Sequence, residues 1–448
     1  MTVQPPPPRP LALPEYPDLR PAPPARPRLL FLPRTNLPEV TVILGLPRGR
    51  AHAPESAPGL VDVCIELLKE GTGRHSSREI AEFLDRYAIQ LDQEVELEFS
   101  LLAVSCLPSF LDGALDLFAE LLFEPTFPER ETELLKQRWL SLLLAQRADP
   151  GFLAEERIAA ERFPSHPYSR ISLPPDWLQN VRPAELHEYY GLSFPPADSF
   201  FLVAGDFDEK ELEARLLQHF EDWAERELSP LPPPPEFPSQ PAVHLVHRPA
   251  SVQAHVAVAF PGIAAADPRR DALELANRAL GGGGSARLFL NLRERRGLTY
   301  GVYSQLRTHS LTGLWKIQTS VLAERAGEAV REILVEVRRL VEEPPQGEEL
   351  ERCRAELLGG YLRRLESTAT LGWLEAVRIL KGLPEDYYRG YVERIRSVTT
   401  GEIAAAAASL SADLQPLVAV VGDRATLEPQ LSDLGPVLVY DTEGRRIA

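Results

Sequence analysis

The residues that most often hold metals or act as nucleophiles are scattered in this chain. The three cysteines, Cys64, Cys106 and Cys353, are far apart and form no CxxC pair for zinc or redox chemistry. We expect them to be buried free thiols in a reducing compartment. His244 and His247 are three residues apart in strand-like sequence, where neighbouring side chains alternate between faces. These two histidines are therefore predicted to point in opposite directions.

Two carboxylates, Asp62 and Glu66, are four residues apart in the helix-like segment GLVDVCIELLKE at 59–70, so they share one helix face. A hard cation prefers such oxygen ligands, but no third ligand is evident, and we interpret the pair as a polar helix face. The glycine run at 281–284 lacks the Gly-Lys-Ser/Thr ending and the preceding strand of a phosphate-binding loop. It is predicted to be a turn between helices.

The elements that must position these residues occur twice, in the same order. In each pair of ranges that follows, the first lies in the N-terminal copy and the second in the C-terminal copy. Strands are predicted at 39–47 and 254–262, helices at 59–70 and 269–280, glycine-containing breaks at 71–73 and 281–284, and second helices at 77–88 and 285–296. Further strands follow within 93–107 and 300–322, helices after Pro/Glu-rich turns within 124–143 and 343–362, and last strands at 199–207 and 416–424. The pattern predicts an α+β protein of two homologous domains, each a mixed β-sheet covered by helices.

Proline-rich sequence marks the domain borders. Residues 1–28 are predicted to be an extended arm, and residues 228–241, LSPLPPPPEFPSQP, a semi-rigid linker. These segments leave an N-terminal domain at 29–227 and a C-terminal domain at 242–448. Two domains joined in this way are expected to face each other across a cleft, which is a usual place for a ligand.

The composition restricts the partners. The chain has 48 Lys and Arg against 65 Asp and Glu, a net charge of -17. That field repels nucleic acid and anionic membranes, so we expect neither as a partner. No apolar run is long enough to cross a bilayer and the N-terminus lacks a signal-peptide pattern, which predicts a cytoplasmic protein. The 43 prolines and the excess of arginine over lysine suit a thermophile or a GC-rich genome equally.

The string LGGGGSARLFLNLRERRGLTYGVYS at 280–304 resembles the C-terminal domain of the M16 zinc peptidases, particularly the two-domain M16B type related to pitrilysin and mitochondrial processing peptidase. The resemblance implies an M16 metallopeptidase or LuxS-like fold in both halves. It also implies that Arg293 and Tyr300 are the substrate-binding pair of the family. The arginine would bind the peptide backbone, and the tyrosine would donate a hydrogen bond to the scissile carbonyl as it becomes an oxyanion.

The first half departs from the same family. The family's zinc motif, His-x-x-Glu-His, matches Asp62, Ile65 and Glu66, so both imidazoles and the general base are absent. The family's third ligand, a glutamate farther along the chain, matches the Ser-Leu-Leu of residues 141–143. We therefore predict no metal site in this chain.

By this resemblance the chain keeps the substrate-binding residues and lacks the zinc ligands, which implies that the two roles lie on two subunits. The resemblance predicts that this chain is the zinc-less, non-catalytic subunit of a heterodimeric M16B peptidase. The partner would be a homologous subunit that has an intact His-x-x-Glu-His and holds the zinc. Arg293 and Tyr300 would complete the partner's active site in trans. The substrates would be oligopeptides or unfolded segments, and the chain would not be a peptidase by itself. Two alternatives remain open at this level: an inactive scaffold like the core subunits of a respiratory complex, and a homologue that binds peptides without cutting them. A zinc-free homodimer is also compatible with the sequence.

Overall fold

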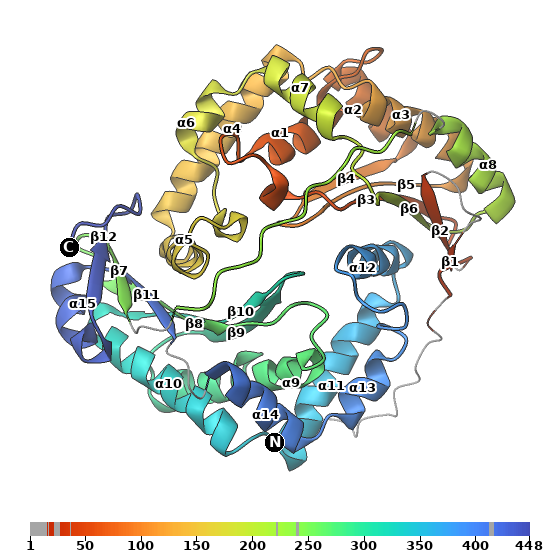
Figure 1. Cartoon of the computed structure of the whole chain (residues 1–448). Helices are drawn as coiled ribbons and strands as arrows, with labels where there is room; N and C mark the ends of the chain where they lie inside the picture. Colours follow the sequence, from red (N-terminus) through yellow and green to blue (C-terminus); the bar gives the residue numbers. More distant parts are fainter. Residues whose placement is uncertain are drawn as a thin grey trace.

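The structure is a computed structural model that describes residues 16, 18–21, 27–35, 37–220, 223–238, 242–411 and 416–448. These residues form two six-stranded mixed sheets with helices packed around them, which confirms the predicted two-domain α+β fold (Figure 1). The strand orders are β1-β2-β6-β3-β5-β4 and β12-β7-β11-β8-β10-β9.

The first sheet belongs to the N-terminal half. Its strands are β1 (Arg20–Pro21), β2 (Arg28–Pro33), β3 (Val40–Leu46), β4 (Gln90–Val95), β5 (Ser100–Cys106) and β6 (Phe200–Gly205). β2 and β6 run parallel, and the other pairs are antiparallel. The central strands β3, β5 and β6 are buried along their whole length, as their apolar sequences require of strands covered on both faces.

The second sheet repeats this arrangement. Its strands are β7 (Val243–His247), β8 (Gln253–Pro261), β9 (Val302–Thr308), β10 (Gly313–Leu322), β11 (Leu417–Gly422) and β12 (Val437–Tyr440). Strand for strand its order matches that of the first sheet, with β11 in the place of β6 and β8 in the place of β3. The outermost strands differ, because β1 is antiparallel to β2 whereas β12 is parallel to β7.

The helices follow the duplicated pattern as well. The N-terminal half has α1 (Leu60–Leu67), α2 (Ser77–Tyr87), α3 (Leu111–Phe123), α4 (Glu129–Ala148), α5 (Pro150–Arg162), α6 (Pro175–Asn180), α7 (Pro183–Ser193) and α8 (Glu209–His219). The C-terminal half has α9 (Arg270–Gly281), α10 (Ala326–Glu342), α11 (Gly347–Arg364), α12 (Thr368–Leu380), α13 (Tyr391–Ser397), α14 (Thr400–Ser411) and α15 (Arg424–Leu431).

The second helix predicted at 285–296 is shorter than the sequence suggested. The structure has a π-helical segment at Phe289–Arg295, which ends before Gly297 in a left-handed conformation with φ of 60°. The glycine run before it explains the late start, because glycine is a poor helix former.

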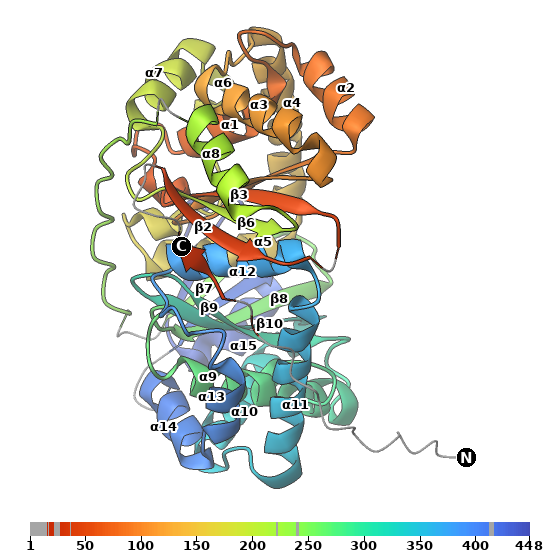
Figure 2. The same cartoon turned by 90° about the vertical axis from the view of Figure 1, so that its right-hand side faces the viewer.

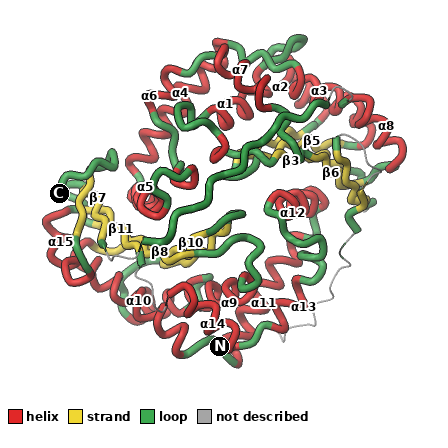
Figure 3. The backbone as a smooth tube through the Cα atoms, in the orientation of Figure 1, coloured by secondary structure: helices red, strands yellow, loops and turns green. Residues whose placement is uncertain are grey.

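The two halves interlock by exchanging one helix each (Figures 2 and 3). α5 of the N-terminal half packs on β8 and β11 of the second sheet, and α12 of the C-terminal half packs on β3 and β6 of the first. Gly372 of α12 lies so close to the first sheet that a Cβ there would meet Ile43 and Ala204 at about 3 Å. Each sheet therefore has its inner face covered by the other half, which makes one rigid architecture of two repeats.

The segments predicted as arm and linker are described in part. Residues 228–238 form neither helix nor strand, and residues 239–241 lie outside the described part. The carbonyl oxygens of Pro232 and Pro235 lie 2.9 Å from His166 Nε2 and 2.7 Å from Arg162 Nη1, which ties the segment to α5 and the loop after it. Most of 1–28 also lies outside the described part, but Tyr16 bonds to Glu375 of α12.

None of the helices that the structure describes combines the length and the apolar composition needed to span a bilayer.

Candidate functional site

An arginine–aspartate pair occupies the position that the sequence resemblance aligns with a first zinc ligand. α1 is apolar on nearly every face, and its Asp62 is buried at 6% exposure while Ile65 joins the core. The short 3-10 turn Arg50–His52 precedes α1, and Arg50 donates from Nε and Nη2 to Asp62 Oδ1 at 2.9 and 2.7 Å. Burial raises the pKa of Asp62, and the guanidinium opposes that rise.

Glu66 and residues 141–143, which align with the second and third zinc ligands, are also unsuited to zinc. Glu66 accepts from Arg138 Nη2 at 2.7 Å and from Lys69 Nζ at 3.3 Å. On α4, Ser141 donates its hydroxyl hydrogen to the carbonyl of Gln137, and Leu142 is 54% exposed. Within the described ranges, no group of three His, Cys, Asp or Glu side chains is arranged to hold a metal. The residues present do not fit a zinc ion, because cations already neutralise both carboxylates.

No sequence pattern pointed to Arg50 or Arg138. Arg50 is 12 positions from Asp62, in the 3-10 turn before α1, and Arg138 is 72 positions from Glu66. A small cavity of about 210 Å³ lies beside the Arg50–Asp62 pair, and Trp139, Leu142 and Leu143 of α4 provide its apolar wall.

The predicted substrate-binding pair lies at the surface. The Arg293 guanidinium is 4.6 Å from the centre of the Phe289 ring, its Nε is 3.6 Å from Glu294 Oε1, and its side chain is 45% exposed. Tyr300 lies two residues before β9 and is 91% exposed. Among the described residues, no hydrogen bond is made by its phenol, and neither residue contacts Asp62 or Glu66. The fold of this chain therefore does not use Tyr300 as a packing residue.

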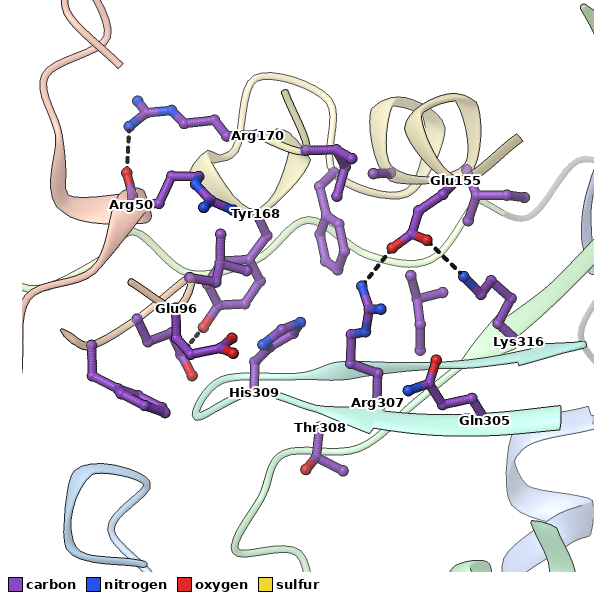
Figure 4. A pocket seen from close by; sticks show the side chains of 18 of the residues that line it. Arg50, Glu96, Glu155, Tyr168, Arg170, Gln305, Arg307, Thr308, His309 and Lys316 are labelled. Atoms are coloured by element: carbon purple, nitrogen blue, oxygen red, sulfur yellow. Dashed lines mark hydrogen bonds and ion pairs between the residues drawn. The ribbon is translucent and has the colours of Figure 1, made fainter. Parts of the chain in front are cut away.

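A second site lies between the two halves, which we call the interdomain cavity (Figure 4). Its volume is about 380 Å³, and its walls come from the β4–β5 turn, α5 and the segment 168–171 of one half and from the β9–β10 hairpin of the other. Glu155 of α5 accepts from Arg307 Nη1 at 2.7 Å and from Lys316 Nζ at 3.1 Å. The predicted cleft between the domains thus contains a charged cavity.

A buried carboxylate bridges the same walls. Glu98, 8% exposed, accepts a hydrogen bond from the Tyr168 hydroxyl and one from the backbone N–H of Ser310 at 2.8 Å. Glu98 and Ser310 are 212 positions apart, so nothing local in the sequence could have revealed this contact. The bond fixes the β9–β10 hairpin against the first half.

The three cysteines are buried free thiols, as predicted. Burial raises the pKa of Cys106 and of Cys353 to about 11, and burial also raises that of Cys64. Because the thiolate is the reactive form, these side chains are inert packing residues at neutral pH.

We expect the isolated chain to bind no stoichiometric zinc. After dialysis against zinc and then against metal-free buffer, elemental analysis should find well below one ion per chain. A chelator should leave the melting temperature unchanged, because the described part of the chain contains no group of side chains arranged to hold the ion. One tightly held zinc per chain would contradict this prediction.

Comparisons with known proteins identify one family. Two profiles of one family match the chain: the one described as insulinase (peptidase family M16) over residues 31–175, and the one described as the peptidase M16 inactive domain over residues 180–357. An uncharacterized zinc protease of Streptomyces coelicolor is 25% identical over 312 residues, covering 68% of each chain.

A relative of Helicobacter pylori named as a non-peptidase homolog is 23% identical over 381 residues, covering 82% of this chain and 85% of that protein. The solved structure of a peptidase M16 inactive domain from Pseudomonas fluorescens superposes with a TM-score of 0.84 at 23% identity, covering 91% of this chain and 98% of the other. Duplicated fold, altered zinc motif and matched profiles lead to one conclusion: the chain belongs to the peptidase M16 family.

Proposed function

We propose that this chain is the non-catalytic subunit of a heterodimeric M16B zinc peptidase. It supplies Arg293 and Tyr300 in trans to a homologous subunit that has an intact His-x-x-Glu-His and holds the zinc. The substrates are oligopeptides or unfolded peptide segments, and the pair works in the cytoplasm.

The contrast between the two halves carries this proposal. The two carboxylates aligned with the zinc motif are engaged in ion pairs, Arg50 with Asp62 and Arg138 with Glu66, so neither is a free ligand. Tyr300, by contrast, is 91% exposed. Its phenol makes no hydrogen bond in the described part of the chain, so it is available to contact another molecule. A chain that completes another chain's active site is expected to keep an accessible Tyr300 and to lack free zinc ligands. This chain has that combination.

The chemistry of the pair suits this role. A phenol just before a strand can donate a hydrogen bond where negative charge develops on a peptide carbonyl oxygen, which favours the transition state. The guanidinium of Arg293, resting on the Phe289 ring, presents several donors in a fixed plane and can hold carbonyl oxygens in register. The partner's zinc would supply the activated water, which no residue at the Asp62, Ile65 or Glu66 positions can provide.

Affinity capture from the native cells tests the proposal. We expect the tagged chain to co-purify with a homologous chain of similar size that carries His-x-x-Glu-His, in equal amounts by mass spectrometry. The reconstituted pair should hydrolyse peptides, and each chain alone should not. Recovery of this chain alone, or with unrelated proteins, would refute the heterodimer and favour the scaffold or the peptide-binding reading, which the non-peptidase name of the Helicobacter pylori relative also suggests.

A further inference from the structure

The interdomain cavity has features that a purely structural interface does not need. We infer that it binds the carboxylate of a peptide that lies along β9, supplied either by the peptide's C-terminus or by an Asp or Glu side chain. This inference rests on the proposed role in peptide binding and specifies which peptides are preferred.

The charge inside the cavity is the first argument. Its lining includes five cationic side chains, Arg50, Arg170, Arg307, Lys316 and Lys381, and three carboxylates, Glu96, Glu98 and Glu155. Asp62 pairs with Arg50, and Glu155 pairs with Arg307 and Lys316. An anion in the cavity could therefore bind the two remaining lining cations, Arg170 and Lys381, which form no ion pair in the described part of the chain.

Two of these cations lack a carboxylate partner. Arg170 Nη1 donates to the carbonyl of Ala53 at 2.6 Å, and Lys381 Nζ donates to the carbonyl of Thr308 at 3.3 Å. Within the described part of the chain, neither forms an ion pair. Burial lowers the pKa of both side chains, and the more distant carboxylates Glu55 for Arg170 and Glu98 and Glu96 for Lys381 oppose that shift.

Two histidines near these cations have lowered pKa values. Burial, with Lys381 and Arg307 close by, lowers the pKa of His309 to about 3. Burial and the guanidiniums of Arg48 and Arg170 lower the pKa of His52 to about 4. Both imidazoles are neutral at pH 7, so they add no charge to the cavity.

A path leads from the substrate-binding pair to the cavity. Tyr300 precedes β9, the outermost strand of its sheet, on which Tyr303, Gln305 and Arg307 alternate on the exposed face while Val302 and Ser304 face inward. Gln305 and Arg307 line the cavity. Tyr300 and Arg307 are seven residues apart, so at about 3.3 Å per residue an extended chain covers roughly 23 Å between them.

The spacing makes the inference specific. A peptide that lies in an extended form beside β9, with one carbonyl at Tyr300, would place a residue about seven positions away at the cavity. The volume of about 380 Å³ is at the lower end of ligand pockets, so it admits the end of a chain or one side chain rather than a folded segment.

Fluorescence anisotropy with the purified full-length chain tests this site without a partner subunit. The probes are three labelled peptides of about ten residues with uncharged side chains. The first is amidated at its C-terminus, and the second has a free C-terminal carboxylate. The third is amidated and has a single Asp in place of an Asn. A carboxylate on a charged donor contributes enough to expect roughly tenfold tighter binding for at least one acidic probe than for its neutral twin. Equal affinities within both pairs would overturn the inference.

Lys381→Gln is the matched variant, because glutamine can keep the hydrogen bond to Thr308 while the charge is removed. We expect it to abolish the acidic preference and to leave the affinity for the neutral peptide and the melting temperature unchanged. Lys210→Gln, on the exposed surface of α8, is the control and should retain the preference. An acidic preference that survives in Lys381→Gln would overturn the site.

The outcomes separate this inference from the proposed function. The isolated chain could prefer acidic peptides while affinity capture recovers no zinc-bearing partner. That result would refute the heterodimer and support the carboxylate site in the cavity. A working pair whose component shows no acidic preference would refute the cavity and keep the heterodimer. The difference between the C-terminal and the Asp probes identifies which carboxylate the cavity takes.

Discussion

Replacing Tyr300 by phenylalanine should lower kcat of the reconstituted pair by roughly tenfold or more, because the phenol would stabilise charge that exists only in the transition state. The ring is 91% exposed and its hydroxyl makes no hydrogen bond in the described part of the chain, so the change should not disturb the fold. Steady-state kinetics with a fluorogenic peptide would measure the effect, while KM should change little.

Two controls make this result interpretable. Tyr87→Phe removes a hydroxyl from a tyrosine whose ring packs between Phe83 and Phe110 on the outside of the first half, and it should leave turnover unchanged. The zinc content and the stability of the pair should be the same in Tyr300→Phe as in the unaltered pair. Unchanged kcat, or a loss explained by dissociation of the pair, would remove Tyr300 from the proposed role.

Replacing Arg50 by leucine should destabilise the chain by about 3 kcal/mol at neutral pH, because it leaves the Asp62 carboxylate buried without its counter-charge. The side chain of Asp62 is 8% exposed, so water cannot replace the guanidinium. Urea unfolding monitored by tryptophan fluorescence would measure the loss. Replacing the exposed Arg325, which pairs with Glu328, should leave the free energy of unfolding almost unchanged and serves as the control.

The pH dependence of the Arg50→Leu variant follows from the same pair. Arg50 lowers the pKa of Asp62 against the rise caused by burial, so its removal raises the folded-state pKa farther above the unfolded value. A raised carboxyl pKa favours folding at low pH and loses that contribution as the pH rises through the folded pKa. The destabilisation should therefore be smaller at pH 5 than at pH 8. Equal losses at both values, or no recovery in an Arg50→Leu, Asp62→Leu double variant, would contradict this account.

Much of the architecture is readable from local patterns. Apolar strands such as 39–47 and amphipathic helices such as 269–280 recur in one order, and hydrophobic periodicity reports local structure because it depends on neighbouring residues. The loss of both histidines at Asp62 and Glu66 is equally visible, since a missing imidazole cannot bind zinc in any fold. The pattern could not reveal that the segment after the glycine run becomes a π-helix, which packing against the sheet and Gly297 decide.

The contacts that replace the zinc site and build the cavity depend on the tertiary structure. Arg138 meets Glu66 across 72 positions, Arg307 meets Glu155 across 152, and Ser310 meets Glu98 across 212. The exchange of α5 and α12 between the sheets also has no local signature, because either helix would bury its apolar face equally well on its own half. Composition and spacing predict the duplicated fold and the absence of zinc ligands, whereas the cationic cavity exists only because the folded halves bring distant charges together.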